Sequence, residues 1–319
     1  MSRAFVFPGQ GAQSIGMGRD LADAYPAARA VFDAVDAALG EDLSGLIWSG
    51  TAEDLQLTRN AQPALMATSV AALRALEAQG VSVTEHAAFV AGHSLGEYSA
   101  LVAAGALELG DAARLLRLRG DAMQSAVPVG DGAMAALLGL DFEAARSVAD
   151  EAAQGEVCQA ANDNDPAQVV VSGHRAAVER AVEIAKARGA KRALLLPVSA
   201  PFHCELMGPA AAAMAEALDD VEIAEPVVPL VANVTAAPVS DAATIRSLLV
   251  DQVTGSVRWR ESVMRMAADG VTEIWEIGAG KALSGMIRRI DKSVATRAIG
   301  TADDVTAAAK SLEESSTDV

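Results

Sequence analysis

Cysteine and lysine are scarce in this sequence, and both shortages limit what the protein can be. Two cysteines among 319 residues, Cys158 and Cys204, are too few for a disulfide framework or a zinc site. We therefore expect no metal ion and a reducing compartment. Only five of the 25 basic residues are lysine, the first being Lys186. Any anion bound by the first half of the chain must be held by arginine, histidine or backbone N–H groups.

Positive charge and long apolar runs are also missing. The 42 acidic residues give a net charge of -17, which argues against nucleic-acid and anionic-membrane binding. No stretch of about 20 uncharged apolar residues predicts a membrane span, and the apolar run before Pro8 is too short for a signal peptide. We expect a cytoplasmic monomer. Its 319 residues, 51% apolar, predict two domains or one large domain with an insertion.

Strands and helices alternate in the outer parts of the chain. Residues 87–91 read as a buried strand that runs through a glycine turn into a helical pattern over 97–104, an order typical of α/β folds. Other elements are predicted at the following positions: strands over 3–7, 227–231 and 272–277, and helices over 61–79, 205–218 and 281–290.

The middle of the chain predicts a small inserted domain. Its elements follow the order βαββαβ, the split ferredoxin-like unit. They are strands over 133–138, 157–161, 168–171 and 192–198, and helices over 141–153 and 176–188. We therefore expect a small domain over 129–198 and a discontinuous large domain made of 1–128 and 199–319.

The sharpest local signal is Gly92-His93-Ser94-Leu95-Gly96, which lies between the predicted strand and helix. Glycines permit the strained turn that lifts a serine side chain clear of a sheet, and helix N-terminal amides then face a developing oxyanion. The motif alone would arise by chance with a probability of ~0.1, so the flanking strand and helix carry the interpretation. Ser94 is predicted to be a nucleophile.

A serine nucleophile needs a general base, and the chain offers four histidines. We expect His93 to pack beneath the turn, His86 to lie at the surface and His174 to stand where a helix begins. His203 follows the last strand of the insertion and precedes a helix, where the two domains would meet. Position alone leaves His203 open between a general base and an ordinary loop histidine.

Five ordered segments resemble the malonyl-CoA:acyl carrier protein transacylases. They are Phe7-Pro8-Gly9-Gln10-Gly11-Ala12-Gln13, Gly92-His93-Ser94-Leu95-Gly96-Glu97-Tyr98, Leu118-Arg119-Gly120, Pro197-Val198-Ser199-Ala200-Pro201-Phe202-His203 and Glu276-Ile277-Gly278-Ala279-Gly280. The resemblance runs from Phe5 to about Ile290. It implies an α/β-hydrolase-like large domain that carries a ferredoxin-like insertion, in agreement with the pattern of elements.

The resemblance also implies roles for particular residues. Ser94 and His203 would form a catalytic dyad, and the backbone N–H groups of Gln10 and Leu95 would bind the oxyanion. The family has no carboxylate in a catalytic triad, and backbone carbonyls near the position of Gln252 are expected to hold the histidine.

Four residues match substrate-binding positions of the family, and Gln252 is one of them. Arg119 would grip the free carboxylate of malonate, Asn162 would line the site, and Phe202 would restrict the acyl group, although some stand-alone members carry a small residue there. Asp163 and Asp165 lie between serine and histidine in chain order, where a hydrolase would carry its acid. We place both in a loop of the insertion instead.

The implied activity is ping-pong transfer of a malonyl group from malonyl-CoA to the phosphopantetheine thiol of an acyl carrier protein, without a cofactor. Three alternatives remain open: an acyltransferase that serves a polyketide synthase, a serine esterase or thioesterase, and a non-catalytic module that binds carrier proteins.

Carrier proteins of this kind are typically acidic, so docking on an acidic chain requires a local basic patch. The predicted patch consists of Arg188, Lys191 and Arg192. A second candidate consists of Lys281, Arg288 and Arg289.

Overall fold

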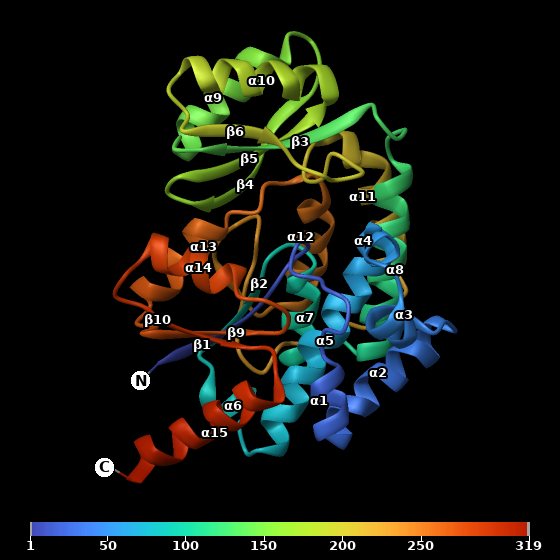
Figure 1. Ribbon diagram of the computed structural model, residues 1–319, viewed down its shortest axis with the longest axis vertical. Coiled ribbons are helices and arrows are strands. Elements are labelled where there is room, and N and C mark those ends of the chain that lie inside the picture. The colour runs from blue at the N-terminus through green and yellow to red at the C-terminus, as the bar shows by residue number, and fades with distance from the viewer. Residues whose placement is uncertain (1, 318–319) are drawn as a thin grey trace.

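The computed structural model describes residues 2–317, which build two β-sheets with helices around them (Figure 1). The larger sheet has the strand order β10-β9-β1-β2-β7-β8, and all its neighbours run parallel except β7 and β8. Its strands are β1 (Arg3–Phe7), β2 (Phe89–Gly92), β7 (Leu230–Val231), β8 (Pro238–Val239), β9 (Glu273–Ile277) and β10 (Ala295–Ile299).

Helices cover both faces of this sheet, as a parallel sheet requires. The helices of this larger unit are α1 (Arg19–Ala24), α2 (Pro26–Leu39), α3 (Leu43–Ser49), α4 (Ala52–Gln56), α5 (Thr58–Ala78), α6 (Val83–His86), α7 (Gly96–Ala103), α8 (Leu109–Ser125), α11 (Gly208–Asp219), α12 (Ala242–Thr254), α13 (Trp259–Ala268), α14 (Ala282–Ile290) and α15 (Ala302–Thr317), with a 3-10 turn over Glu205–Met207.

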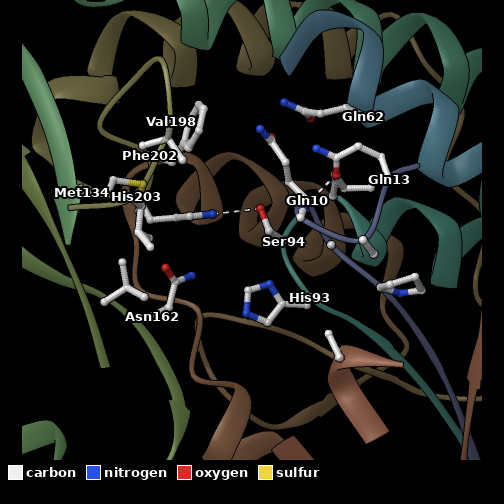
Figure 2. A pocket seen from close by; sticks show the side chains of 18 of the residues that line it. Gln10, Gln13, Gln62, His93, Ser94, Met134, Asn162, Val198, Phe202 and His203 are labelled. Atoms are coloured by element: carbon white, nitrogen blue, oxygen red, sulfur yellow. Dashed lines mark hydrogen bonds between the residues drawn. The ribbon is translucent and has the colours of Figure 1, made fainter. Parts of the chain in front are cut away.

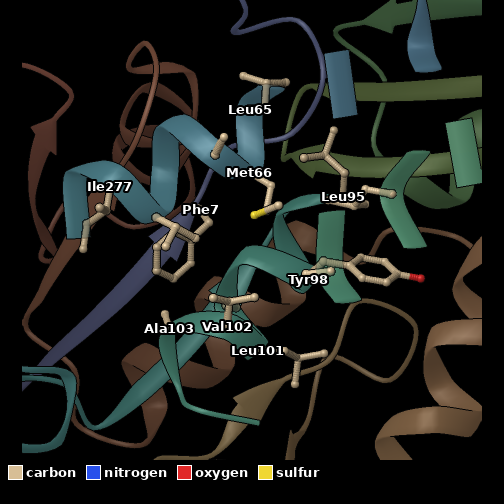
Figure 3. Packing of buried hydrophobic residues seen from close by; sticks show 14 of the residues in the cluster. Phe7, Leu65, Met66, Leu95, Tyr98, Leu101, Val102, Ala103 and Ile277 are labelled. Carbon is tan, nitrogen blue, oxygen red and sulfur yellow. The ribbon is translucent and has the colours of Figure 1, made fainter. Parts of the chain in front are cut away.

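Strand β1 shows how the two faces differ. Phe5 and Phe7 point into the main core, which α5 and α7 close with side chains such as Met66 and Tyr98 (Figure 3). Ala4 and Val6 point to the other face, where α13 and α14 cover them. The alternation of side chains along a strand therefore serves two separate cores.

The smaller sheet is antiparallel, has the order β4-β5-β3-β6, and carries its helices on one face only (Figure 1). Its elements are β3 (Gly132–Leu138), α9 (Phe142–Ala153), β4 (Cys158–Asp165), β5 (Gln168–His174), α10 (Arg175–Ala187) and β6 (Arg192–Leu195). Ala135 and Leu137 pack against the helices, whereas Met134 and Ala136 face the opposite way and line a cavity.

Strand β4 joins the small sheet to the large unit. The N–H of Asp163 donates to the carbonyl of Val257 at 2.9 Å, and Val257 donates to Ala161 at 2.9 Å. Two buried carboxylates on β4 pair with arginines of the large unit, Asp163 with Arg260 at 2.8 Å and Asp165 with Arg289 at 2.8 Å. The small sheet is therefore held over the carboxyl end of β2.

Some predicted elements end differently in the structure. The strand predicted over 157–161 continues to Asp165, so the placement of Asp163 and Asp165 in a loop was wrong. Their ion pairs compensate the burial of two carboxylates, a contact that local sequence does not reveal. The strand predicted over 192–198 ends at Leu195, two residues before Pro197, which cannot donate to a ladder.

Two features are absent from the residues that the structure describes. No helix within 2–317 is long and apolar enough to cross a membrane. Over the same residues, no cluster of three or more His, Cys, Asp or Glu side chains could hold a metal ion.

Candidate active site

Ser94 stands on a strained turn between β2 and α7. Its φ of 52° lies in the left-handed region, which a residue with a side chain rarely adopts. The flanking glycines make the turn possible, since a Cβ on Gly92 would lie 1.9 Å from the carbonyl carbon of Gly96, and a Cβ on Gly96 would lie 2.3 Å from the carbonyl oxygen of Phe7. The hydroxyl is thereby presented to the cavity (Figure 2).

His203 is hydrogen-bonded to this hydroxyl, with Nε2 2.8 Å from Ser94 Oγ (Figure 2). Its other ring nitrogen, Nδ1, lies 2.9 Å from the backbone carbonyl of Gln252. A carbonyl can only accept, so Nδ1 carries the proton and the lone pair of Nε2 faces the serine. The ring therefore has the tautomer that a general base needs.

The environment keeps His203 neutral. Burial, aided by the positive charge of Arg119, lowers the pKa of its imidazole to about 3, against a smaller opposing effect of the bond to Gln252. The histidine can therefore take a proton at neutral pH rather than already holding one.

Arg119, on α8, is a buried cation that pairs directly with no carboxylate of residues 2–317. It is 1% exposed, and its Nη1 and Nη2 donate at 2.7 Å to the side-chain oxygens of Gln62 and Gln252. Nη2 also lies 3.2 Å from Ser94 Oγ, and the buried Nε–H has no acceptor within the described residues. A guanidinium held in this way beside a serine hydroxyl is suited to bind an anionic group of a substrate.

Gln252 lies behind the other site residues rather than in the cavity wall. Its Nε2 donates to the backbone oxygen of Ser94 at 2.9 Å and to Oε2 of Glu97 at 2.6 Å, while its Oε1 accepts from Arg119. Sequence reasoning missed Glu97, although its place directly after the glycine turn was a usable signal. Burial raises the pKa of the Glu97 carboxyl to about 7.

Two backbone N–H groups near Ser94 have no acceptor among the described residues. Neither Gln10 nor Leu95 donates its N–H to another group of residues 2–317. The loop that holds Gln10 lies close to the serine turn, since a Cβ on Gly9 would come within 2.6 Å of the carbonyl oxygen of His93. The side-chain oxygen of Gln10 accepts from Thr58 at 3.0 Å and is thereby fixed.

The site opens into a cavity of about 640 Å³ between the two sheets. Asn162 and Phe202 both line it, from β4 and from the histidine loop (Figure 2). His93 lines it too, but bonds Asn164 at 2.8 Å rather than the serine. The remaining histidines lie elsewhere: His86 contacts Ser82, and His174 accepts the N–H of Val157.

The two predicted basic patches differ in their surroundings. Arg188 pairs with Glu151 of α9 in the helical layer of the small sheet, while Lys191 and Arg192 are exposed. In the second patch Lys281 is exposed and directly precedes Ala282 and Leu283, which line the cavity.

A family model described as the acyl transferase domain matches residues 4–307 of the chain. The chain belongs to the acyl transferase family. In this acyl transferase Ser94 and His203 are hydrogen-bonded to each other, and no carboxylate is bonded to His203 within the described residues.

Relatives with names and solved structures cover nearly the whole of this acyl transferase. A malonyl CoA-acyl carrier protein transacylase of Bacillus subtilis is 47% identical over 98% of this chain and 97% of its own. An acyl-carrier-protein-S-malonyltransferase from Bartonella henselae is 55% identical in sequence. Its crystal structure matches with a TM-score of 0.96, over 98% of this chain and 100% of its own. A malonyl-transacylase solved in complex with a type II polyketide synthase acyl-carrier protein is 43% identical in sequence. Its TM-score is 0.94, over 98% of this chain and 100% of its own.

We predict that the reactivity of Ser94 does not follow the titration of an ordinary histidine. Because the pKa of His203 is lowered to about 3, the imidazole stays neutral as the pH falls through 6.5. The rate constant for modification by an uncharged serine-directed phosphonate should therefore not drop tenfold per unit below about pH 6.5. His203→Ala should react slowly at every pH. A fall centred near 6.5 in the unsubstituted protein would contradict the assignment.

Proposed function

We propose that this enzyme transfers a malonyl group from malonyl-CoA to the phosphopantetheine thiol of an acyl carrier protein, through a malonyl ester on Ser94. The observation that carries the proposal is the position of Arg119, 3.2 Å from a serine that is bonded to a neutral histidine. Among the described residues, no carboxylate pairs directly with this buried cation. The activities named for the relatives support it. No cofactor is required for this chemistry.

We also propose finer descriptions of the two units. The small sheet, with its βαββαβ order and antiparallel arrangement β4-β5-β3-β6, is consistent with a ferredoxin-like domain over 129–198. The serine turn between β2 and α7 in a mostly parallel sheet supports an α/β-hydrolase-like large domain over 1–128 and 199–319.

The first half-reaction begins when His203 Nε2 takes the proton of Ser94 Oγ as the oxygen attacks the thioester carbonyl. The carbonyl oxygen becomes an oxyanion that the N–H groups of Gln10 and Leu95 bind. Each such donor is worth about 2.7–4 kcal/mol of barrier. Collapse of the tetrahedral intermediate breaks the C–S bond, and the imidazolium returns its proton to the leaving CoA thiolate.

Arg119 would select the acyl group. Its planar guanidinium can bind the free carboxylate of malonate, and the buried Nε–H without an acceptor supplies a further donor. An acetyl group has no carboxylate and would offer the guanidinium nothing to bind. Phe202 and Asn162, in the cavity wall, would contact the acyl chain.

The second half-reaction repeats the first with a new nucleophile. The phosphopantetheine thiol of the carrier protein gives its proton to His203 and attacks the malonyl ester, and Ser94 leaves as the free hydroxyl. The ester must survive between the two steps, which requires that water be kept from an attacking position.

The carrier protein is proposed to dock beside Lys281. This exposed lysine stands at the start of α14, whose next residues line the cavity, and it belongs to no ion pair within the described residues. Arg288, on the same helix, donates to the hydroxyl of Thr296 and forms no ion pair with the part of the chain that the structure describes. Each patch has one arginine that is already paired, Arg289 with Asp165 and Arg188 with Glu151, so the preference for Lys281 rests on its position beside the cavity.

Charge reversal should distinguish the two patches. Lys281→Glu is expected to raise the KM for an acyl carrier protein severalfold and to leave loading from malonyl-CoA unchanged, because only the encounter of the two proteins is affected. Lys191→Glu is the matched control from the other patch. Steady-state kinetics of both half-reactions provide the measurement, and a larger effect of Lys191→Glu would move the docking site to the small sheet.

Substitution of Arg119 tests the proposed substrate. Arg119→Ala should lower malonyl loading of Ser94 by at least tenfold while acetyl loading changes much less, because the lost bond to a buried carboxylate is worth about 2–5 kcal/mol. The mass of the intact protein after brief exposure to malonyl-CoA or acetyl-CoA measures both. An equal loss with the two thioesters would remove Arg119 from acyl recognition.

A further inference from the structure

Glu97 is a second charged group buried at the active site, and the steps described above do not use it. It lies on α7, three residues after Ser94, and is 1% exposed. Its Oε2 accepts from Gln252 Nε2 at 2.6 Å, and the backbone N–H of Asn233 also donates to the carboxylate. A carboxylate this deep requires compensation of its charge.

Arg119 provides this compensation through Gln252. The amide of Gln252 accepts from Arg119 Nη2 at 2.7 Å on one side and donates to Glu97 on the other, so one side chain bridges the cation and the anion. The attraction acts on both groups, since Arg119 lowers the pKa of Glu97 and Glu97 raises the pKa of Arg119, each against the larger effect of burial.

We propose that Glu97 is the resident counter-charge of Arg119, and that binding of an acyl group with a free carboxylate at Arg119 is coupled to uptake of a proton by Glu97. The inference rests on the proposed function, because malonate would bring the second negative charge. One buried cation then faces two anions, and each anion disfavours the ionised form of the other. An acetyl group adds no charge and leaves Glu97 as it was.

The ionisation of Glu97 is easily shifted. Burial raises its pKa to about 7, so both forms are present near neutral pH and a modest added field changes their ratio. A protonated Glu97 still has an oxygen that can accept from Gln252. The proton can therefore be taken up without a change in the positions of Gln252 and the dyad.

Other ionisable groups around Glu97 do not compete with it. Burial raises the pKa of Tyr98 to about 12 and lowers that of His203 to about 3, so both are neutral at pH 7. On α12, Asp251 is exposed and Arg246 donates to the carbonyl of Val221. Apart from Arg119, the charged side chains of β1, α5 and α8 form ion pairs away from the site: Arg3–Glu273, Arg59–Asp121, Arg74–Glu77, Arg114–Asp111 and Arg117–Glu41.

Calorimetry on the Ser94→Ala protein tests the coupling without acylation. Malonyl-CoA and acetyl-CoA are titrated at about pH 8 in two buffers of different ionisation enthalpy, which gives the protons taken up per ligand bound. The phosphates of CoA titrate with both ligands and cancel in the difference. Binding of malonyl-CoA should be accompanied by the uptake of up to about one proton more than binding of acetyl-CoA. An equal uptake would overturn the proposal.

Two variants in the same background identify the group responsible. Glu97→Gln should abolish the extra proton uptake seen with malonyl-CoA. Glu41→Gln should retain it. Glu41 is the matched control because it pairs with Arg117, which lies on the same helix as Arg119. A surplus that persists in Glu97→Gln would overturn the assignment. Should Glu97→Gln fail to fold, the comparison of the two thioesters in Ser94→Ala still decides the coupling.

Kinetics of the enzyme with Ser94 intact give a second readout. The KM for malonyl loading should rise by up to about tenfold per pH unit above pH 7, and Glu97→Gln should flatten this dependence. A KM without pH dependence in the unsubstituted enzyme would contradict the coupling. If malonyl-CoA neither binds nor acylates Ser94, the proposed function itself fails, which is a different result from loading without proton uptake.

Discussion

The hydrogen bonds of Gln252 are the constraint on which the rest of the active site depends. Its backbone carbonyl sets the tautomer of His203, and its side-chain amide contacts the backbone of Ser94, the carboxylate of Glu97 and the guanidinium of Arg119. The carbonyl is available because Gln252 lies in the last turn of α12, where carbonyls lack partners within the helix. The end of one helix therefore fixes the orientation of both members of the dyad and of the cation.

This arrangement explains how the site can lack the acid of a catalytic triad. A backbone carbonyl orients the imidazole but gives an imidazolium less stabilisation than a carboxylate would. A thiol is a better leaving group than an amine, so less help is needed when the substrate is a thioester. Burial also keeps Nε2 of His203 without a proton, since the imidazole is neutral over the physiological range. The carboxylate that the site does bury, Glu97, contacts Gln252 rather than His203.

The sequence revealed the site better than the packing that holds it. Strand, glycine turn and helix around Ser94 follow local rules, so β2 and α7 were predicted within two residues of their observed bounds. Contacts between distant segments could not be read in this way. Asp163 and Asp165 pair with arginines that lie 97 and 124 residues later in the chain. These pairs, and the bridge from Glu97 to Arg119, depend on tertiary placement. Family resemblance, not periodicity, pointed to Gln252 and Arg119.

The most direct test of acyl transfer is the release of CoA when the enzyme is mixed rapidly with malonyl-CoA and no carrier protein. We predict a burst of one CoA per active site, followed by almost no further release until a phosphopantetheinylated carrier protein is added. The burst should coincide with the gain of one malonyl group in the mass of the protein and be absent in Ser94→Ala. Steady release of CoA and free malonate without a carrier would show a hydrolase and contradict the account.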